Sequence, residues 1–431
     1  MEQKQMNRRD QRRKEQMRRR RNRRLALLGI GALLVIIVII LLVKAISAIG
    51  NAVAEPEDAP VAAETQQNEK KGEILEVTFK ATGDNLIHNT IYEQAAARST
   101  DGGYDFSYCY NDIIPIIEGT DLVFVNQETP VATSVFEPSN YPLFNTPSES
   151  VTALKDAGFN LFNLASNHSL DKGTKGIEAT LDFMDSVQGI THFGSYRNYT
   201  DEHTPRVVEK NGITFAFVGV TEMTNGMSLP SDTELDIVYT EQSEKIKAML
   251  KEAKDAADVV VLSAHWGDEN VLAADQRQKD MAADFAEWGA DIIIGHHPHV
   301  LQEIESVTTS DGRSVPVVYS LGNFISAMRN KSNHIGGFYG CTFQKNTATG
   351  EVNITDQSFT PVVNYFTSGY QNMKVVPFSA YTNDMAASHG LGISMEDVNS
   401  VLKDTVGTDL LKDMPKSSSS LDDDEILPDA A

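Results

Sequence analysis

Between residues 73 and 335 the chain alternates between amphipathic stretches and short apolar runs. The runs are LVFVN, LFNLAS, VVVLSA and IIIG, each preceded by Asn or Asp and followed by polar residues. Apolar residues at helical spacing precede them, as in Met281, Phe285 and Trp288, and a glycine such as Gly289 ends the stretch. Helices that alternate with fully apolar strands are typical of an α/β fold with a largely parallel sheet covered on both faces.

The pattern changes in the C-terminal part of the domain. Here shorter segments alternate apolar and polar residues, which favours antiparallel strands at 338–343, 352–354 and 359–365. We expect residues 336–415 to complete the domain with strands and a helix. Residues 416–431 are rich in Ser and Asp, which is typical of a disordered acidic tail; a segment that docks a partner is the alternative.

An apolar run of a different kind lies near the N-terminus. Residues 25–43 contain no charged side chain, and as a helix rising ~1.5 Å per residue they would span about 28 Å, close to the thickness of a bilayer core. A buried core helix would show a polar stripe, which this run lacks, and the apolar region of a signal peptide is only ~7–15 residues long. We expect one transmembrane helix, with cleavage among the small residues after Lys44 as the alternative.

Charge divides the chain at this apolar run. Residues 1–24 hold twelve Lys or Arg and three Asp or Glu, so the whole chain's −23 and this segment's +9 leave −32 for the rest. The arginines from Arg18 to Arg21 favour a cytoplasmic N-terminus, and hence a single-pass protein of the cell membrane with its main domain extracellular. A basic segment beside a membrane span sets topology or contacts the lipid bilayer, so no nucleic acid partner is expected.

Two further features concern the rest of the chain. Residues 44–72 are mostly polar after their first few positions and include Pro and Ala, which predicts a flexible stalk before a strand that begins near Ile74. The two cysteines, Cys109 and Cys341, are too few for a disulfide framework. They either pair in an oxidising compartment or are simply buried, and the sequence leaves both alternatives open.

Polar residues able to bind a metal follow the apolar runs. Because ligands of α/β folds bind beyond the carboxyl ends of strands, we expect these side chains to meet at one edge. Burying several polar groups costs kilocalories each unless a partner binds them, and a divalent cation would do so. A structural histidine cluster is the alternative. The candidate ligands are Asp84, Glu128, Asn167, His265, His297 and His299.

The donor set narrows the choice of metal. Imidazole, carboxylate and amide groups without thiolate suit zinc, manganese or iron, so one or two divalent ions are expected. His297 and His299 are two residues apart and would share a face of a regular strand. Pro298 between them instead favours an extended loop.

The motifs SNHSLDKG, SAHWGDEN and GHHPHVLQ, in this order, resemble those of the CapA family of poly-γ-glutamate capsule biosynthesis proteins, within the calcineurin-like metallophosphoesterase superfamily. The likeness runs from about residue 77 to residue 325. It implies a metallophosphoesterase-like sandwich of two sheets flanked by helices, here preceded by one transmembrane helix, with metals at the strand ends. It also implies synthesis or export of an anionic polymer at the cell surface, with that polymer or its precursor and membrane synthase subunits as partners.

The resemblance implies a role for each candidate ligand. By position, Asp84 and His299 bind a first metal, Glu128 is the bridging carboxylate, and Asn167, His265 and His297 bind a second metal. The same comparison gives two catalytic candidates. His168 resembles the histidine that donates a proton to the leaving group. Asp171 is a candidate for orienting it, with the start of the helix that carries Ile177, Leu181 and Met184 as the alternative.

The sequence departs from the superfamily pattern at a few positions. Leu86 stands where the first motif has a histidine, and His88 is the candidate replacement. Glu128 is longer than the usual bridging aspartate, and Ser169 stands where an acidic residue usually follows the catalytic histidine. Asn323 in SLGNF is a candidate pocket residue, with a simple turn former as the alternative.

Two classes of function fit these residues. One is a metal-dependent hydrolase that acts on a phosphoester or on an acyl or amide bond of a cell-surface polymer, with His168 as general acid. The other is a non-catalytic accessory subunit of a membrane synthase that binds poly-γ-glutamate. In that case the charge of −32 would repel a polyanion unless cations bridge the two.

Overall fold

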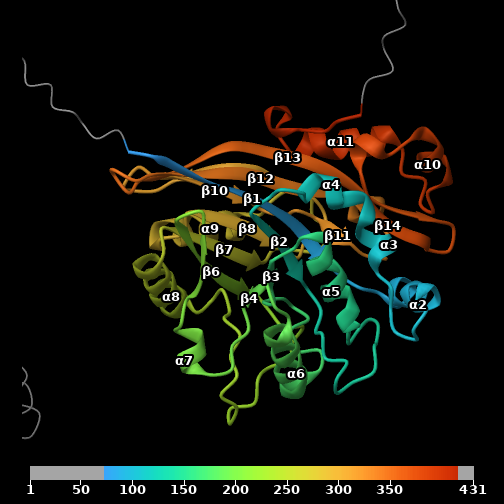
Figure 1. Ribbon diagram of the computed structural model, residues 1–431, viewed down its shortest axis with the longest axis horizontal. Coiled ribbons are helices and arrows are strands. Elements are labelled where there is room, and N and C mark those ends of the chain that lie inside the picture. Colours follow the sequence, from blue (N-terminus) through green and yellow to red (C-terminus); the bar gives the residue numbers. More distant parts are fainter. Residues whose placement is uncertain (1–71, 416–431) are drawn as a thin grey trace, which may run out of the picture. The chain divides into compact units, whose positions relative to one another are not determined.

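The computed structural model describes residues 72–415, which form two mixed β-sheets flanked by helices (Figure 1). The predicted basic tail, transmembrane helix and acidic tail lie outside these residues, as does the predicted stalk up to residue 71. Within the described range, no helix combines the length and the apolar character needed to cross a membrane. The α/β class with two sheets and flanking helices is confirmed, but each sheet is mixed instead of largely parallel.

The first sheet places the C-terminal strands on one side of β1 and the next strands of the chain on the other. Its order is β14-β13-β12-β1-β2-β3-β4, and β11 also pairs with β1. Strands β1 to β4 and β11 are parallel, whereas β12, β13 and β14 are antiparallel. The strands are β1 (Ile74–Asn85), β2 (Leu122–Gln127), β3 (Leu161–Asn163), β4 (Thr191–Phe193), β11 (Asn323–Ile325), β12 (Ile335–Asn346), β13 (Val352–Thr367) and β14 (Gln371–Pro377).

The second sheet has a parallel centre and an antiparallel strand at each edge. Its order is β5-β6-β7-β8-β10-β9, in which β6, β7, β8 and β10 are parallel. The strands are β5 (Arg206–Lys210), β6 (Ile213–Thr221), β7 (Val259–His265), β8 (Ile292–His296), β9 (Ile304–Thr308) and β10 (Ser314–Val318).

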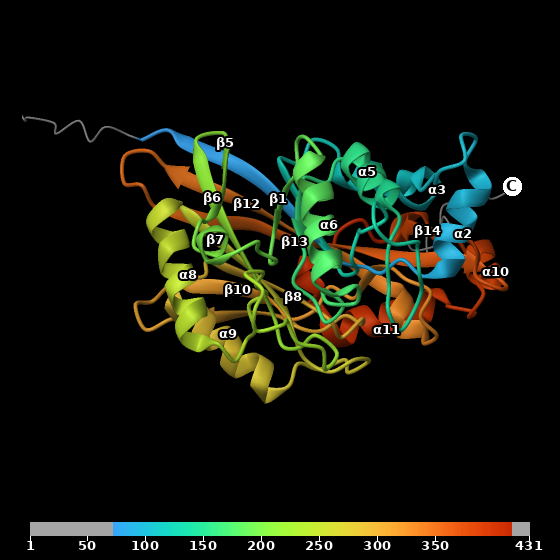
Figure 2. The ribbon, with the colours of Figure 1, turned by 90° about the horizontal axis from the view of Figure 1, so that it is seen from below.

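Helices cover the outer faces of both sheets. In Figure 2, α5 and α6 lie on one side of the molecule and α8 and α9 on another. Residues of α3, α5 and α6 join one apolar cluster with the first sheet, and residues of α8 and α9 join another with the second sheet. The α-helices are α2 (Asn89–Arg98), α3 (Ser107–Tyr110), α4 (Ile114–Ile117), α5 (Ser148–Ala157), α6 (Gly173–Ser186), α7 (Tyr199–Glu202), α8 (Ser243–Ala256), α9 (Gln276–Trp288), α10 (Asn383–Ser388) and α11 (Met395–Thr405). Short 3-10 turns are η1 (Asn111–Ile113), η2 (Lys331–His334), η3 (Phe378–Ala380) and η4 (Thr408–Leu410).

The apolar strands are apolar because both of their faces are covered. In β7, Val259 and Val261 join the cluster between the two sheets, whereas Val260 and Leu262 join the cluster under α8 and α9. β2 alternates in the same way between the inner cluster and the one under α5 and α6. This double coverage removes the polar alternation of a half-exposed strand.

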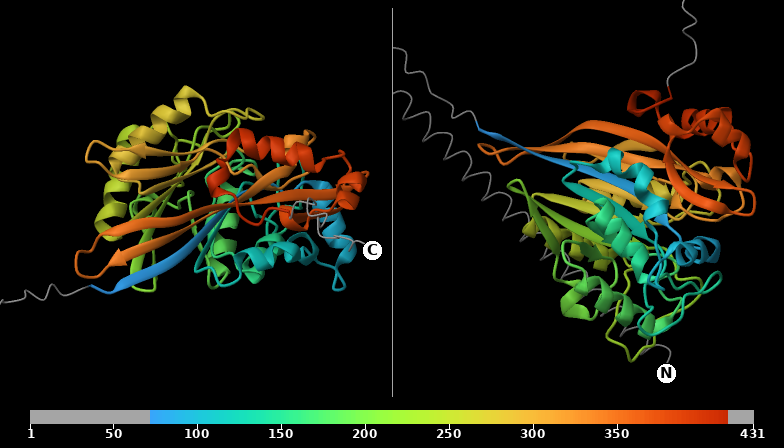
Figure 3. Two further views of the ribbon diagram at one scale, coloured as in Figure 1. Left: turned by 90° about the horizontal axis from the view of Figure 1, so that it is seen from above. Right: turned by 45° about the vertical axis from the view of Figure 1, so that its right-hand side comes forward.

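The C-terminal strands differ in one respect from the prediction. The segments expected at 352–354 and 359–365 belong to a single long strand, β13. The polar residues between them include Asp356 at φ 51, and here two β13 residues stand opposite one residue of β12. Such a bulge absorbs an extra residue without ending the strand. The predicted antiparallel pairing is confirmed, and β12 pairs with β1 along most of its length (Figure 3).

Candidate metal centre

The carboxyl ends of strands from both sheets meet at one place. Asp84 lies near the end of β1 beside Asn126 of β2, and His265 ends β7 beside His296, the last residue of β8. His296 Nδ1 lies 3.5 Å from Asp84 Oδ1, so the two sheets touch through these side chains. The polar strand ends predicted from the sequence therefore share one buried region.

A close backbone approach holds Asp84 in position. The Asp84 N–H donates to the carbonyl of Gly322, at 3.1 Å. A Cβ on Gly83 would stand 1.8 Å from that same carbonyl oxygen, so only glycine allows β1 and the segment before β11 to lie so close. The Asp84 carboxylate accepts a hydrogen bond from Asn126 Nδ2 at 2.7 Å.

Three buried side chains form the inner group, which we define as Asp84, Glu128 and His299. One ligand atom from each lies within 4.8 Å of the other two. His299 Nδ1 is 3.2 Å from Asp84 Oδ2, and His299 Nε2 is 3.6 Å from Glu128 Oε1. Among the described residues, neither Glu128 oxygen has a hydrogen-bond partner. A buried carboxylate without donors is costly, and a divalent cation fits this donor set.

The remaining predicted ligands border the inner group. His265 Nε2 lies 3.0 Å from Asn167 Oδ1 and 4.0 Å from Glu128 Oε1. The rings of His265 and His297 are 4.8 Å apart. His297 Nδ1 is buried and has no hydrogen-bond partner in the described part of the chain. The structure thus brings all six predicted ligands together, while their individual roles stay predictions.

The segment that carries His297 and His299 is not the extended loop that the sequence predicted. β8 ends at His296, and the next two histidines adopt positive φ angles, 96° for His297 and 58° for His299. Such angles are strained for residues with a Cβ and persist where surrounding contacts impose them. The backbone N–H of His297 faces Asp84 Oδ2 at 3.4 Å. The tight path turns both imidazoles toward the strand ends.

Asn323 fixes the ring of His299. This residue starts β11, is fully buried, and its Oδ1 lies 2.9 Å from His299 Nδ1. Its amide also donates to the carbonyl of Asn333 at 3.0 Å. When His299 Nδ1–H donates here, Nε2 is left free on the side of Glu128, as in histidines that bind metals. The candidate pocket residue is therefore more than a turn former.

The catalytic candidates form a pair next to the centre. His168 Nδ1 lies 2.8 Å from Asp171 Oδ2, which also accepts the N–H of Phe144 at 2.7 Å. Phe144 packs edge-on against the His168 ring, with 4.8 Å between ring centroids. This arrangement leaves Nε2 of His168 available for proton transfer, and it agrees with an orienting role for Asp171.

His88, the candidate replacement for the missing first-motif histidine, has one ring nitrogen against the backbone. Its Nδ1 lies 3.2 Å from both the N–H of Ala327 and the carbonyl of Leu86, so backbone groups occupy it. Burial lowers the pKa of His88 to about 4. Among the described residues it belongs to neither group of side chains that can hold a metal. The chain leaves β1 toward α2 here, and His88 packs edge-on against Phe144.

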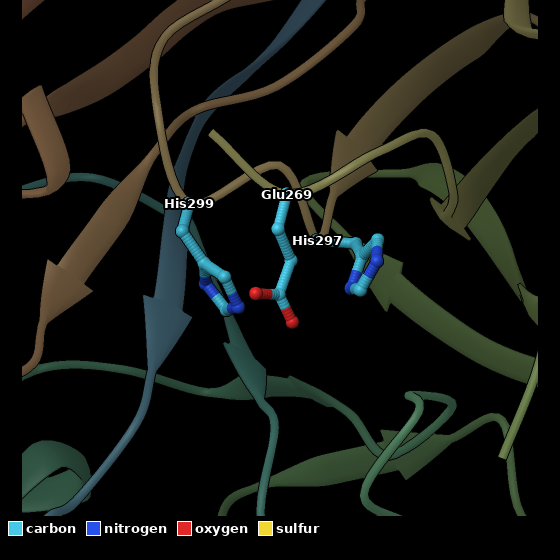
Figure 4. A group of neighbouring side chains, drawn as sticks. All are labelled: Glu269, His297 and His299. Atoms are coloured by element: carbon cyan, nitrogen blue, oxygen red, sulfur yellow. The ribbon is translucent and has the colours of Figure 1, made fainter. Parts of the chain in front are cut away.

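Two residues of the region were missed by sequence reasoning. Glu269 in the loop between β7 and α9 forms an outer group with His297 and His299, again with ligand atoms within 4.8 Å of one another. Its carboxylate lies between the two imidazoles (Figure 4). The sequence feature that could have indicated Glu269 is its position four residues after His265 in SAHWGDEN. Acidic residues in exposed loops are common, so this position alone did not single it out. His296 was noted only as a strand end.

Burial and neighbouring charges set the pKa values of the inner group. Burial raises the pKa of Glu128 well above its usual range. Burial would also raise the pKa of Asp84, but contacts with His296 and His299 outweigh it and hold that pKa well below its usual range. Burial opposes a charge on His299, yet Glu128 and Asp84 raise its pKa to about 10. A cation that binds here must therefore displace a proton.

The cysteines take no part in this centre. Cys109 and Cys341 are both free and buried, and they lie in different apolar clusters. Burial raises the pKa of the Cys109 thiol to about 12. Of the two alternatives that the sequence left open, the structure has the unpaired, buried one.

Fold and site together define an α/β protein with a centre of histidines and carboxylates where two facing sheets end. Residues 78–328, more than half of the chain, match the family model described as "Bacterial capsule synthesis protein PGA_cap", and the chain belongs to this family. The CapA resemblance drawn from the motifs is confirmed.

Individual relatives agree with the family. The chain is 31% identical over 260 residues to the PGA biosynthesis protein CapA of Bacillus subtilis (strain 168), which covers 59% of this chain and 63% of the relative. It is 29% identical over 266 residues to the capsule biosynthesis protein CapA of Bacillus anthracis, covering 59% and 61%. Less than two thirds of each relative is therefore spanned. Among solved structures, a novel phosphatase from Mycoplasma pneumoniae aligns at a TM-score of 0.40 and 15% identity, over 68% of this chain and 95% of that chain.

Proposed function

We propose that this protein is a membrane-anchored, extracytoplasmic component of poly-γ-glutamate capsule synthesis or export, and that its centre is a metal-dependent hydrolase site. Membership of the capsule synthesis family is the basis for assigning the protein to the polymer pathway. Metal dependence, chemistry and location are inferences from the residues of this chain. A divalent cation bound here would supply Lewis-acid catalysis at the bond that is cleaved.

One observation carries the metal-dependent part. Glu128 is buried, and in the described part of the chain both of its carboxylate oxygens lack a hydrogen-bond donor. Its neighbours are His299, with Nε2 at 3.6 Å, and His265, with Nε2 at 4.0 Å. Histidine and carboxylate side chains that face one another with free ligand atoms are the usual surroundings of zinc or manganese.

The pair of His168 and Asp171 supports hydrolysis. A buried carboxylate that accepts from one imidazole nitrogen holds the ring in place and leaves the other nitrogen for proton transfer. The 2.8 Å contact between His168 Nδ1 and Asp171 Oδ2 has this geometry, and Phe144 holds both partners. His168 then delivers a proton to the leaving group of a cleaved polymer bond.

A cavity beside the centre supports an anionic substrate. It encloses about 700 Å³ and reaches from His88 to Asn333, whose amide donates to the backbone carbonyl of His299 at 3.2 Å. Its described lining contains Arg329 but no Asp or Glu, in a chain with 60 acidic residues. Tyr141 and Tyr370 add aromatic surface. An acidic polymer meets less repulsion here than elsewhere on such an acidic protein.

Membrane anchoring rests on residues 1–43. The basic segment and the uncharged run that follows it support a single span with the N-terminus in the cytoplasm. The test is protease treatment of intact cells with antibodies to both ends of the chain. Digestion that removes the main domain and spares the N-terminal tag supports this location, and full protection contradicts it.

A non-catalytic accessory role is the second candidate. The observation in its favour is Leu86, which stands at the first-motif position, while one ring nitrogen of His88 lies against the backbone. A metal site with fewer protein ligands than the superfamily pattern leaves coordination positions open. A cation bound there could contact carboxylates of the polymer as well as take part in catalysis.

The deciding experiment uses the full-length chain in detergent, stripped with EDTA and reloaded with Mn²⁺ or Zn²⁺. Substrates are a γ-linked glutamate polymer and a model phosphodiester. Cation-dependent turnover supports the hydrolase, and cation-dependent polymer binding without turnover supports the accessory role. If the cation changes neither turnover nor binding, both candidates fail.

A further inference from the structure

We propose that Glu269, in the loop between β7 and α9, is a metal ligand on the solvent side of the centre, beside His297 and His299. The inference rests on the proposed metal dependence. It adds a residue that the position-by-position comparison with the superfamily did not assign.

The geometry of the outer group carries the proposal. One ligand atom each of Glu269, His297 and His299 lies within 4.8 Å of the others. The carboxylate stands between the two rings in Figure 4. Nδ1 of His297 is buried without a hydrogen-bond partner among the described residues, so one nitrogen of this imidazole is free to bind a cation.

The backbone holds Glu269 in this place. Its neighbour Asn270, at φ 65, donates its N–H to the carbonyl of Pro298 at 2.8 Å. The Asn270 side chain accepts from Asn330 Nδ2 at 3.0 Å and from Asn333 Nδ2 at 2.8 Å. The loop is thus tied to the very segment that carries the two histidines. A ligand that is held in advance loses little entropy when it binds.

Charge distinguishes Glu269 from the acid beside it. Asp268 lies 3.5 Å from Arg277 and forms an ordinary surface ion pair. Within residues 72–415, Glu269 makes no ion pair with Lys or Arg and lies against imidazoles instead. A bound divalent cation would be the largest positive charge near this carboxylate, so its attraction would stabilise Glu269 in this position.

The test compares two charge-removing substitutions in the same loop, Glu269→Gln and Asp268→Asn. Mn²⁺ and Zn²⁺ binding to the full-length chain in detergent is measured by calorimetry, and bound metal by elemental analysis. Removal of even an indirect partner costs a metal site about 10–100-fold in affinity, so E269Q should lose about tenfold or more. D268N should bind as the wild type does. Both residues are exposed, so melting temperatures in EDTA should match.

Each outcome bears on a different claim. Equal binding by E269Q and wild type overturns the ligand assignment and leaves the metal centre intact. Equal losses in E269Q and D268N show long-range attraction instead of ligation, and also overturn it. If the wild type binds neither cation, the proposed function fails, and the inference fails with it.

Discussion

Glu128 and Glu202 are both buried glutamates, yet their surroundings differ. Glu202, at the end of α7, has its Oε2 3.3 Å from Lys245 Nζ, so a cation of the protein itself faces the carboxylate. Glu128 has no Lys or Arg within ion-pair distance in the described part of the chain, only His265 and His299. A buried carboxylate with its own lysine is a structural feature. A buried carboxylate that faces only imidazoles points to a cation from outside.

The largest effect is expected for Glu128→Gln. The amide keeps the shape and loses the charge, so Mn²⁺ affinity should fall by about 100-fold or more. Stability in EDTA should change little, because the variant removes the contacts with His299 and His265 but also the cost of a buried carboxylate that lacks hydrogen-bond donors among the described residues. Calorimetric titration and thermal melts in EDTA check both parts. A variant that is less stable without metal would mean that the carboxylate has a structural partner.

The control for this comparison is Glu202→Gln. It changes an equally buried glutamate that lies outside both candidate metal groups. Mn²⁺ affinity should stay at the wild-type value. A loss like that of E128Q would show that removal of any buried carboxylate disturbs the protein, and the contrast between the two sites would be void.

A second prediction distinguishes metal binding from proton transfer in catalysis. His168→Ala should lower metal-dependent turnover by about 10²–10⁴-fold, because a general acid contributes that much. Mn²⁺ binding should be unchanged, since His168 donates to Asp171 and belongs to neither metal group. Single-turnover rates beside calorimetry provide the measurement. Loss of binding together with turnover would place His168 among the ligands.

The cavity beside the centre gives a smaller effect. Arg329→Glu should weaken polymer binding by about two- to tenfold at low salt, because an exposed charge acts through a screened field. Lys331→Glu is the matched control with the same change of charge, since Lys331 lies outside the cavity lining and pairs with Asp397 at 3.0 Å. Polymer binding is followed by fluorescence anisotropy at two salt concentrations. Identical behaviour of the two variants would remove the cavity from the binding path.

The smallest effect concerns the pH dependence of stability. Burial, together with Asp236, raises the pKa of Glu202 from its usual 4.5 to about 7 despite Lys245. The folded state therefore holds this proton more tightly than the unfolded chain. Its contribution is complete below pH 4.5 and is lost as the pH rises through about 7. Between pH 5 and 8, wild type should lose on the order of 1 to 2 kcal/mol more stability than E202Q. Denaturant unfolding of both proteins at pH 5 and at pH 8 tests this. An equal change in the free energy of unfolding for the wild type and E202Q would contradict it.

Much of the fold followed from the sequence pattern. Apolar runs such as the one that ends at His265 predicted buried strands, because only doubly covered strands lack polar alternation. Parallel strands place their carboxyl ends at one edge, and this predicted that Asp84 and Glu128 would meet. The extent of β13 was not predictable, since a bulge at Asp356 depends on pairing with β12.

For the centre, the sequence by itself determined which side chains end the strands, because chain order and strand period place them there. Only the tertiary structure decided which loops fold back over them. It brought Glu269 between His297 and His299 and set Nδ1 of His88 against backbone groups, because loop paths depend on long-range contacts. Asn270, for example, contacts residues about 60 positions further along the chain. The local sequence pattern carries no record of such contacts, whereas it does indicate the buried parallel strands.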